Sequence, residues 1–297
     1  QYFKNANCQF LIFSKTSYFQ KSKHAFALGL ISVLTGFALA APPIPPVNQL
    51  PTGPKVGSGS VSITQTQTNA AASMVVNQTS PKAIVNWDTF NLGSKADITF
   101  NQPNTSSALL NRILDNNPSQ ILGQIKSDGQ VFFTNPNGIY FGPSSSVSVG
   151  SLLATTNSIS DKDFLSGNYK FTGNGSSQSI LNEGQLSINA SGGFGALLAS
   201  SVSNKGVITA QLKGTVVLAS GESYQLQFDS GNDSLSNVLV SPSAIAALVE
   251  NSQLIQAPGG TILMTAQAAS ALMGGVVRNT GTIDASGIVE QGGVIRL

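Results

Sequence analysis

Much of the chain consists of short segments rich in β-branched residues, broken by polar or glycine-containing turns. Alternation with a period of two is typical of strands that bury one face, and closely spaced turns are typical of all-β proteins. The strand at residues 224–229 alternates cleanly, and we expect it in a hairpin outside the main fold. The full set of predicted strands is 61–66, 73–77, 82–87, 97–101, 131–134, 139–141, 214–219, 224–229 and 260–265.

Two segments carry a helical pattern instead. Within residues 105–125 the apolar positions fit a helical stripe, but the segment is short, and periodicity does not decide between helix and strand. Residues 241–251 begin with Ser241, a favoured N-cap, and Pro242, which suits the first helical turn, and then continue with an apolar run. We predict one short helix there that ends near Asn251.

An internal repeat runs through the second half of the chain. Asn182-Glu183-Gly184 and Asn204-Lys205-Gly206, 22 residues apart, share a pattern with Asn279-Thr280-Gly281, and an aliphatic residue follows each copy two positions later. A period in the twenties with one or two strands per unit predicts a β-solenoid. Each coil would stack its aliphatic residues and its asparagines on those of the coil before, which gives an apolar core and asparagine ladders at the corners.

The N-terminal region predicts a secretory leader. An apolar run from Ala25 to Ala40 follows several lysines and ends in Ala38-Leu39-Ala40, which is a typical cleavage site. The run is 16 residues long, short of the ~20 that a membrane-spanning helix needs. We therefore assign residues 1–40 to a signal peptide, residues 41–57 to an extended Pro/Gly-rich lead-in, and residues 58–297 to one folded domain.

The two ends of the sequence carry a further expectation. The first residue is glutamine, and the last residues read as an unfinished strand. We expect the natural protein to start upstream of Gln1 and to continue beyond Leu297, so that the folded domain is truncated at its C-terminus.

The composition includes few residues that could carry out catalysis. Charged residues make up only 9% of the chain, and its single cysteine, Cys8, and single histidine, His24, both lie in the predicted leader. The mature chain would have 11 basic against 13 acidic residues and no basic patch. These features speak against a histidine- or cysteine-dependent active site, an ordinary zinc site and nucleic-acid binding. We expect no catalytic residue, cofactor or metal.

The most informative stretch is residues 129–142. Two β-rich segments are joined by Asn135-Pro136-Asn137-Gly138, in which proline presets φ, and asparagine and glycine tolerate positive φ. These residue types alone would also fit an ordinary surface turn with no further function.

The ordered set of motifs resembles a known family. The chain from about Leu50 onward is similar to the N-terminal secretion domain of filamentous haemagglutinin and related large bacterial exoproteins, the cargo of two-partner secretion systems. This is also called the haemagglutination activity domain. The resemblance rests on the segments 82–93, 100–104, 110–113, 117–123 and 129–142.

The resemblance implies both a fold and a secretion pathway. The fold is a right-handed parallel β-helix, a single-stranded solenoid with an N-terminal cap. The protein is exported by the Sec machinery, recognised by the periplasmic domains of an outer-membrane β-barrel transporter, and released from, or displayed on, a Gram-negative cell. The family's secretion motif corresponds here to Asn135, Pro136, Asn137, Gly138 and Ile139. Whether these residues contact the transporter or hold the fold stays open.

Three functions compete at this point. The favoured one is a secretion-targeting and fold-nucleating domain of an adhesin-like exoprotein, whose host-cell or glycan partners would be bound beyond Leu297. The same domain would serve a contact-dependent toxin or haemolysin. The third is a β-helical polysaccharide-degrading enzyme, for which Asp161 with Asp163, or Asp229 with Asp233, are the candidate acids.

Overall fold

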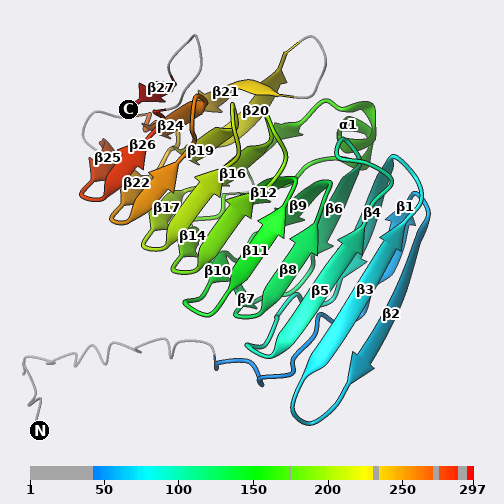
Figure 1. Ribbon diagram of the computed structural model, residues 1–297. Coiled ribbons are helices and arrows are strands. Elements are labelled where there is room, and N and C mark those ends of the chain that lie inside the picture. The colour runs from blue at the N-terminus through cyan, green and yellow to red at the C-terminus, as the bar shows by residue number, and fades with distance from the viewer. Residues whose placement is uncertain (1–42, 174, 230–233, 270–273, 287–292) are drawn as a thin grey trace, which may run out of the picture. The chain divides into compact units, whose positions relative to one another are not determined.

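The strands of the computed structural model wind into a coil with three parallel sheets (Figure 1). Successive strands enter the three sheets in turn, and equivalent residues of neighbouring coils pair, as Leu186 pairs with Ile208. This arrangement confirms the predicted parallel β-helix. The structure describes residues 43–173, 175–229, 234–269, 274–286 and 293–297.

The two larger sheets have nine strands each. Sheet I contains β1 (Lys55–Ser58), β4 (Lys82–Trp87), β6 (Ala108–Ile113), β9 (Gln130–Thr134), β12 (Ser151–Thr155), β16 (Phe194–Ala199), β19 (Thr215–Ser220), β24 (Thr261–Ala266) and β27 (Val294–Arg296). Sheet II contains β2 (Val61–Gln67), β3 (Ala72–Gln78), β5 (Ala96–Asn101), β8 (Gln124–Ser127), β11 (Ser146–Val149), β15 (Gln185–Ile188), β18 (Val207–Ala210), β23 (Leu254–Gln256) and β26 (Thr282–Asp284).

The third sheet is smaller, and a group of four further elements lies outside the coil. Sheet III contains β7 (Ser119–Ile121), β10 (Ile139–Phe141), β14 (Ser179–Asn182), β17 (Ser201–Asn204), β22 (Ala247–Asn251) and β25 (Gly275–Asn279). The outside elements are α1 (Asp161–Ser166), β13 (Lys170–Phe171), β20 (Ser223–Phe228) and β21 (Leu235–Ser241).

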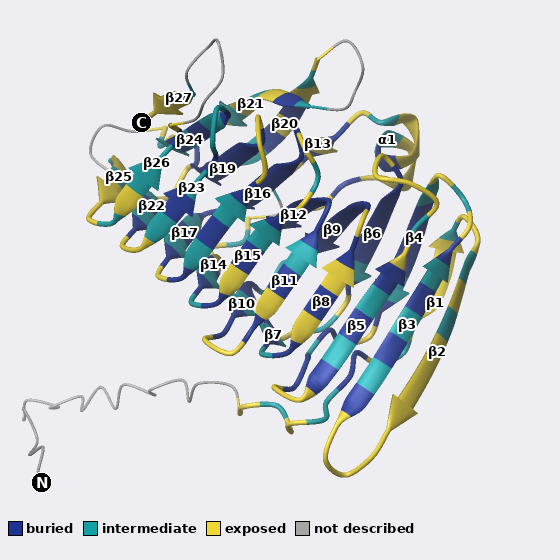
Figure 2. Cartoon of the chain, in the orientation of Figure 1, coloured by how far each residue is buried: buried dark blue, intermediate teal, exposed yellow. Residues whose placement is uncertain are grey.

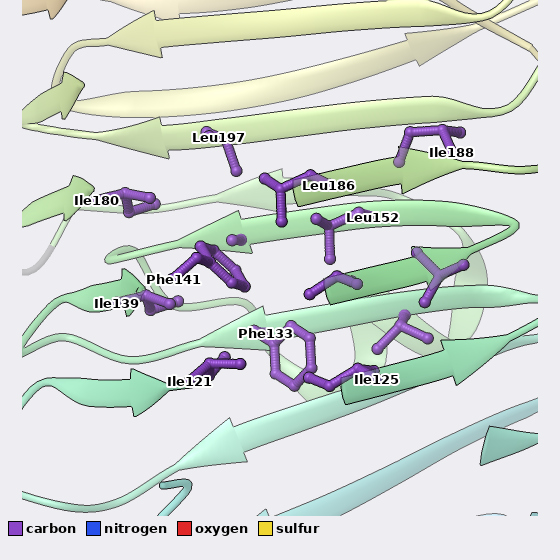
Figure 3. Close-up of a cluster of buried hydrophobic side chains, with 14 of the residues drawn as sticks. Ile121, Ile125, Phe133, Ile139, Phe141, Leu152, Ile180, Leu186, Ile188 and Leu197 are labelled. Carbon is purple, nitrogen blue, oxygen red and sulfur yellow. The ribbon is translucent and has the colours of Figure 1, made fainter. Parts of the chain in front are cut away.

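Alternation along the strands builds the interior core. In sheet II, buried residues alternate with half-buried or exposed ones, as in β15 and β18 (Figure 2). The inward side chains of all three sheets form one continuous apolar cluster, part of which is drawn in Figure 3. Fully burying one such aliphatic or aromatic side chain contributes about 1.5–3 kcal/mol, so stacked coils are stabilised along their whole length.

Sheet I differs because both of its faces are covered. Every residue of β9, β12, β16 and β19 is buried. Its outward side chains, such as Phe132 and Phe194, form a second apolar cluster with Phe164 of α1 and with Tyr169, the residue before β13. The strand predicted at 224–229 is confirmed as part of a hairpin, because β20 pairs with β21 in an antiparallel arrangement.

The helix predicted at residues 241–251 is wrong. Residues 247–251 form β22, which lies between β17 and β25 in sheet III. Alternate residues of β22 are buried against the coil interior, and this burial outweighs the helical preference of the local sequence. The ambiguous segment 105–125 likewise forms strands, namely β6, β7 and the start of β8.

The folded region begins earlier than the predicted Ser58. Leu50 is buried, and β1 pairs with β4 in an antiparallel arrangement, as β2 does with β3. These two antiparallel strands cap the first coil at the edges of sheets I and II. The predicted leader, residues 1–40, lies outside the described residues. Within the described part of the chain, no helix has the length and apolar character to cross a membrane.

Candidate functional site

The Asn135–Ile139 turn connects β9 of sheet I to β10 of sheet III. The amide N–H of Gly138 donates to the carbonyl oxygen of Asn135 at 3.1 Å, and the carbonyl of Gly138 accepts from the amide of Ser119 at 3.0 Å. Gly138 has φ +103°, and a Cβ atom there would lie 2.9 Å from the carbonyl oxygen of Ser179. Glycine at this position is therefore required by backbone conformation and by space.

Asn135 is fully buried, and its polar atoms are bonded within the chain. Its side-chain Nδ2 donates to the carbonyl of Asn117 at 3.1 Å and to Ser119 Oγ at 2.9 Å. Its Oδ1 accepts from the amide of Asn137 at 2.9 Å, and its own amide donates to the carbonyl of Thr155 at 3.0 Å. Asn135 thus joins its own coil to the coils before and after it.

The two middle residues of the turn are half-buried and also bonded. Asn137 Nδ2 donates to the carbonyl of Asp115 at 2.7 Å, in the loop of the preceding coil. The carbonyl of Pro136 accepts from Ser176 Oγ at 2.6 Å, in the loop of the following coil. The turn is therefore tied to the loops on both sides of it.

The aliphatic end of the motif enters the interior core. Ile139 and Phe141 are buried, and Ile139 pairs in register with Ile180 of β14 (Figure 3). Before the turn, Phe133 also points inward and packs against Phe90, with ring centroids 5.0 Å apart. Apolar side chains on both sides of the turn therefore anchor it to the coil interior.

The preceding loop, which Asn137 contacts at Asp115, has exposed residues on both sides of that contact. Leu114 is 57% exposed there, and Asn116 is exposed two residues further along. In the same sheet as the turn, Tyr140 Oη donates to Glu183 Oε2 at 2.6 Å. Burial, this hydrogen bond and the negative charge of Glu183 together raise the pKa of Tyr140 to about 12.

A separate line of asparagines follows the corner between sheets III and II. Asn182 Nδ2 donates to Asn204 Oδ1, Asn204 Nδ2 to Asn251 Oδ1, and Asn251 Nδ2 to Asn279 Oδ1, each at 2.7 Å. This asparagine ladder confirms the predicted one and adds Asn251. Sequence reasoning missed Asn251 because Ser252-Gln253 replaces the Gly-containing pattern, although an aliphatic residue still follows.

The carboxylates proposed for polysaccharide cleavage have structural partners. Asp161 forms an ion pair with Arg112 at 2.6 Å. Asp163 accepts from Ser160 Oγ at 2.6 Å and from Asn168 Nδ2 at 2.8 Å, and these hydrogen bonds lower its pKa. A general acid needs a raised pKa, whereas the pKa of Asp163 is lowered, which does not suit that role. Of the other pair, Asp233 lies outside the described residues.

The acidic residues do not gather into a metal site in the described part of the chain. No group of three or more histidine, cysteine, aspartate or glutamate side chains is placed there to hold a metal ion. The polar atoms of the turn itself bond one another and the neighbouring loops, and they leave no ligand set free.

The capped β-helix and its ordered motifs lead to one protein family. The family model of the TPS secretion domain, where TPS stands for two-partner secretion, matches residues 50–296. The chain therefore belongs to the TPS secretion domain family.

Two relatives come from Haemophilus influenzae and carry the name heme/hemopexin-binding protein. One is 30% identical over 251 residues, covering 82% of this chain and 26% of the relative. The other is 32% identical over 161 residues, covering 54% of this chain and 16% of the relative. The chain thus spans about a quarter of the length of the first relative, or less for the second.

A solved structure shares the fold. The crystal structure of the HMW1 secretion domain from Haemophilus influenzae matches with a TM-score of 0.70 and 27% sequence identity. The match covers 82% of this chain and 62% of that chain. The parallel β-helix and its secretion-domain class are therefore supported independently by sequence and by structure.

Proposed function

We propose that this secretion domain targets a larger exoprotein to a partner outer-membrane β-barrel transporter, whose periplasmic domains recognise it after Sec-dependent export. The finding that carries the proposal is the family match over residues 50–296. The destination would be the surface or the surroundings of a Gram-negative cell. The domain itself would act by recognition and folding, without catalysis or a cofactor.

Within the motif, we assign a structural role to Asn135 and Gly138. All the hydrogen-bonding atoms of the Asn135 side chain have partners inside the chain, and Gly138 is required by its φ. The transporter would instead contact the neighbouring surface formed by Leu114, Asn116 and the half-buried Asn137. The observation behind this division is an apolar side chain, Leu114, that stays 57% exposed beside a fully bonded turn.

Secretion and folding must be measured together to test this division. The protein is produced in a Gram-negative host with and without its partner transporter, and release into the medium is quantified. We expect release to depend on the transporter. Release at the same level without any transporter would contradict the proposed targeting function.

Two variants then separate the roles. Leu114→Ser is expected to lower transporter-dependent release while leaving the thermal unfolding midpoint of the purified protein unchanged. Asn135→Ala is expected to lower both release and the unfolding midpoint. The matched control is Leu212→Ser, which changes another exposed leucine, 45% exposed, in a loop after sheet II. Equal release by the Leu114 and Leu212 variants would argue against a contact at Leu114.

The activity of the whole exoprotein is a separate question. An adhesin or haemagglutinin-like protein is the reading we favour, with a contact-dependent toxin or haemolysin as the alternative. A polysaccharide-degrading role for this domain has no support from Asp161 and Asp163, because the first is paired with Arg112 and the second has a lowered pKa. Assays of the complete exoprotein for cell binding and for lysis separate the first two.

A further inference from the structure

A groove of about 420 Å³ opens at the corner between sheets II and I. Its shape follows from loop length. The connections at 128–129 and at Gly150 are very short, whereas those at 102–107 and 189–193 on either side are longer. Because β6, β9, β12 and β16 are consecutive in sheet I, the two short corners lie between the two longer loops and form the floor of the groove.

The short corners are maintained by close backbone packing. A Cβ atom at Gly150 would lie 2.1 Å from the carbonyl oxygen of Asp128, and one at Gly193 would lie 2.3 Å from the carbonyl of Gly150. The two short corners therefore form the bottom of the groove, and Thr105 and Ser191 of the longer loops line its two sides. This groove is at a different corner from the Asn135–Ile139 turn, which joins sheets I and III.

Gln130 lines the groove, and its side-chain amide plays no part in the hydrogen bonding of the described residues. It is only 6% exposed and contributes to the groove lining. Its backbone is bonded, to the carbonyl of Ser107 at 2.8 Å and to Gln102 Nε2 at 3.3 Å. Its side-chain amide forms no hydrogen bond with any described residue.

The neighbouring glutamines show that this corner normally satisfies such groups. Gln102 Nε2 donates to Gln78 Oε1 at 3.1 Å, and Gln78 Nε2 donates to the carbonyl of Ser80 at 2.7 Å. The Gln130 amide makes no such bond to the described residues and opens onto the groove, so it is a candidate ligand-binding group. Gln130 thus offers the two N–H donors and the carbonyl oxygen of its amide to the groove.

The rest of the lining specifies the chemistry of the ligand. Thr105, Ser106, Ser151 and Ser191 contribute hydroxyl groups, and no charged residue lines the groove. Ser106 and Ser191 already donate within the chain, to Asn104 Oδ1 and to the carbonyl of Leu212, so their oxygens remain as acceptors. Hydroxyl and amide groups both donate and accept, which matches a neutral ligand rich in hydroxyl groups. An extended peptide fits less well, because β9 and β12 already pair on both edges and offer no free backbone edge.

We propose that this groove binds an uncharged carbohydrate, with the side-chain amide of Gln130 bonded to neighbouring sugar hydroxyls. Ser106 and Ser191 would contact the sugar from the two longer loops. Ala190 and Gly193 leave the space for the ring. The site is shallow and lacks an aromatic platform among its lining residues, so the affinity for a single sugar is in the millimolar range, about 1 mM or weaker.

The test is an NMR titration of the purified, 15N-labelled protein. The probes are glucose, galactose, N-acetylglucosamine and lactose, each added up to about 50 mM, a range that reveals millimolar binding. The side-chain amide signals of Gln130 are assigned by their loss in Gln130→Ala. We expect at least one sugar to shift these signals and the backbone amides of Ser106 and Ser191.

Two variants and one control decide whether the shifts report the groove. Gln130→Ala is expected to weaken the binding by about tenfold or more, as the loss of a hydrogen-bonding group would. Ala190→Leu fills the space while leaving Gln130 in place, and it should abolish the shifts without lowering the unfolding midpoint. Gln211→Ala, which removes an exposed amide outside the groove lining, should change nothing.

Several outcomes overturn the proposal. It fails if none of the four sugars shifts the Gln130 signals, or if Ala190→Leu retains full binding. A neutral serine- and threonine-rich peptide is titrated in parallel, and shifts caused by the peptide but by none of the sugars would assign the groove to a polypeptide instead.

Discussion

Asparagine stabilises two corners of this coil in two different ways. In the asparagine ladder, Asn182, Asn204 and Asn251 each donate to the equivalent asparagine of the next coil at 2.7 Å. In the Asn135–Ile139 turn, Asn135 instead bonds three unlike groups, namely a carbonyl, a hydroxyl and a backbone amide. The ladder repeats the same hydrogen bond between asparagines from coil to coil, whereas in the turn one side chain, Asn135, makes several different hydrogen bonds.

The two corners should differ in how much stability a substitution removes. A ladder side chain bonds its asparagine neighbours and, at Asn182, Asn251 and Asn279, also a backbone group two residues further along its own turn. Asn135 connects loops of neighbouring coils, so its loss leaves several buried groups without partners at once. The turn is therefore expected to be the more sensitive of the two corners, and the following predictions rank the effects.

Asn135→Ala should have the largest effect. The substitution leaves Ser119 Oγ and the amide of Asn137 without their partner in a buried site, and we expect a loss of about 4 kcal/mol in the free energy of unfolding. Urea unfolding followed by circular dichroism measures it. Asn116→Ala, at an exposed position in the adjacent loop, is the control and should change stability little. A loss below that of any ladder variant would reverse the ranking.

Gly138→Ala should follow, at about 3 kcal/mol. The added Cβ atom meets the carbonyl of Ser179, and φ of +103° is unfavourable for alanine. Thermal unfolding provides the measurement. Gly175→Ala is the matched control, because Gly175 also has positive φ but an added Cβ there has open space around it. If both variants lose the same stability, only backbone strain matters at Gly138.

Within the ladder, position should set the size of the effect. Asn204→Ala removes a buried inner member and leaves Asn182 Nδ2 and Asn251 Oδ1 unpaired, so we expect a loss of about 2 kcal/mol. Asn279→Ala removes the exposed end member and should cost below about 1 kcal/mol. The two variants are compared by urea unfolding. Equal losses would mean that burial of the ladder does not matter.

The smallest effect should be a change in alkaline stability at Tyr140. Its folded-state pKa of about 12 lies above the ordinary value of 10.0, so the folded state holds this proton more tightly than the unfolded state. The associated stability is therefore present below pH 10 and declines as the pH rises from 10 towards 12. Because Tyr140 is partly exposed, the contribution should stay below about 1 kcal/mol.

Tyr140→Phe tests this linkage directly. The variant should unfold with a shallower dependence on pH between 10 and 12 than the parent protein, as measured by unfolding midpoints at fixed pH values. Glu183→Gln keeps the geometry but removes the charge, and it should lower the tyrosine pKa. An unchanged pH dependence in both variants would show that the bond to Glu183 is too weak to matter.

Much of this architecture follows from local patterns. Strands such as 82–87 and 139–141 were predictable because they are short segments rich in β-branched or aromatic residues and turn residues flank them. The asparagine ladder was predictable from the 22-residue spacing of Asn182 and Asn204. The dense bonding of Asn135 was not, because its partners Asn117 and Ser119 are brought close only when the coils stack.

The failures have a common cause. Residues 241–251 favour a helix locally, yet β22 fills the place between β17 and β25 that the coil would otherwise leave open. The lead-in was predicted to be an extended proline-rich segment outside the core, yet Leu50 is buried. In both cases, contacts with residues distant in sequence outweigh a local preference.

The sequence by itself determined the all-β class, the coil with its repeated turns, the Asn135–Ile139 motif and the family it indicates. Only the tertiary structure decided which face of each strand is covered, that Phe132 and Phe133 point into different cores, and that Gln130 lines a groove without a partner. The reason is physical: turn geometry and strand alternation depend on adjacent residues, whereas burial and hydrogen-bond partners depend on which coil stacks on which.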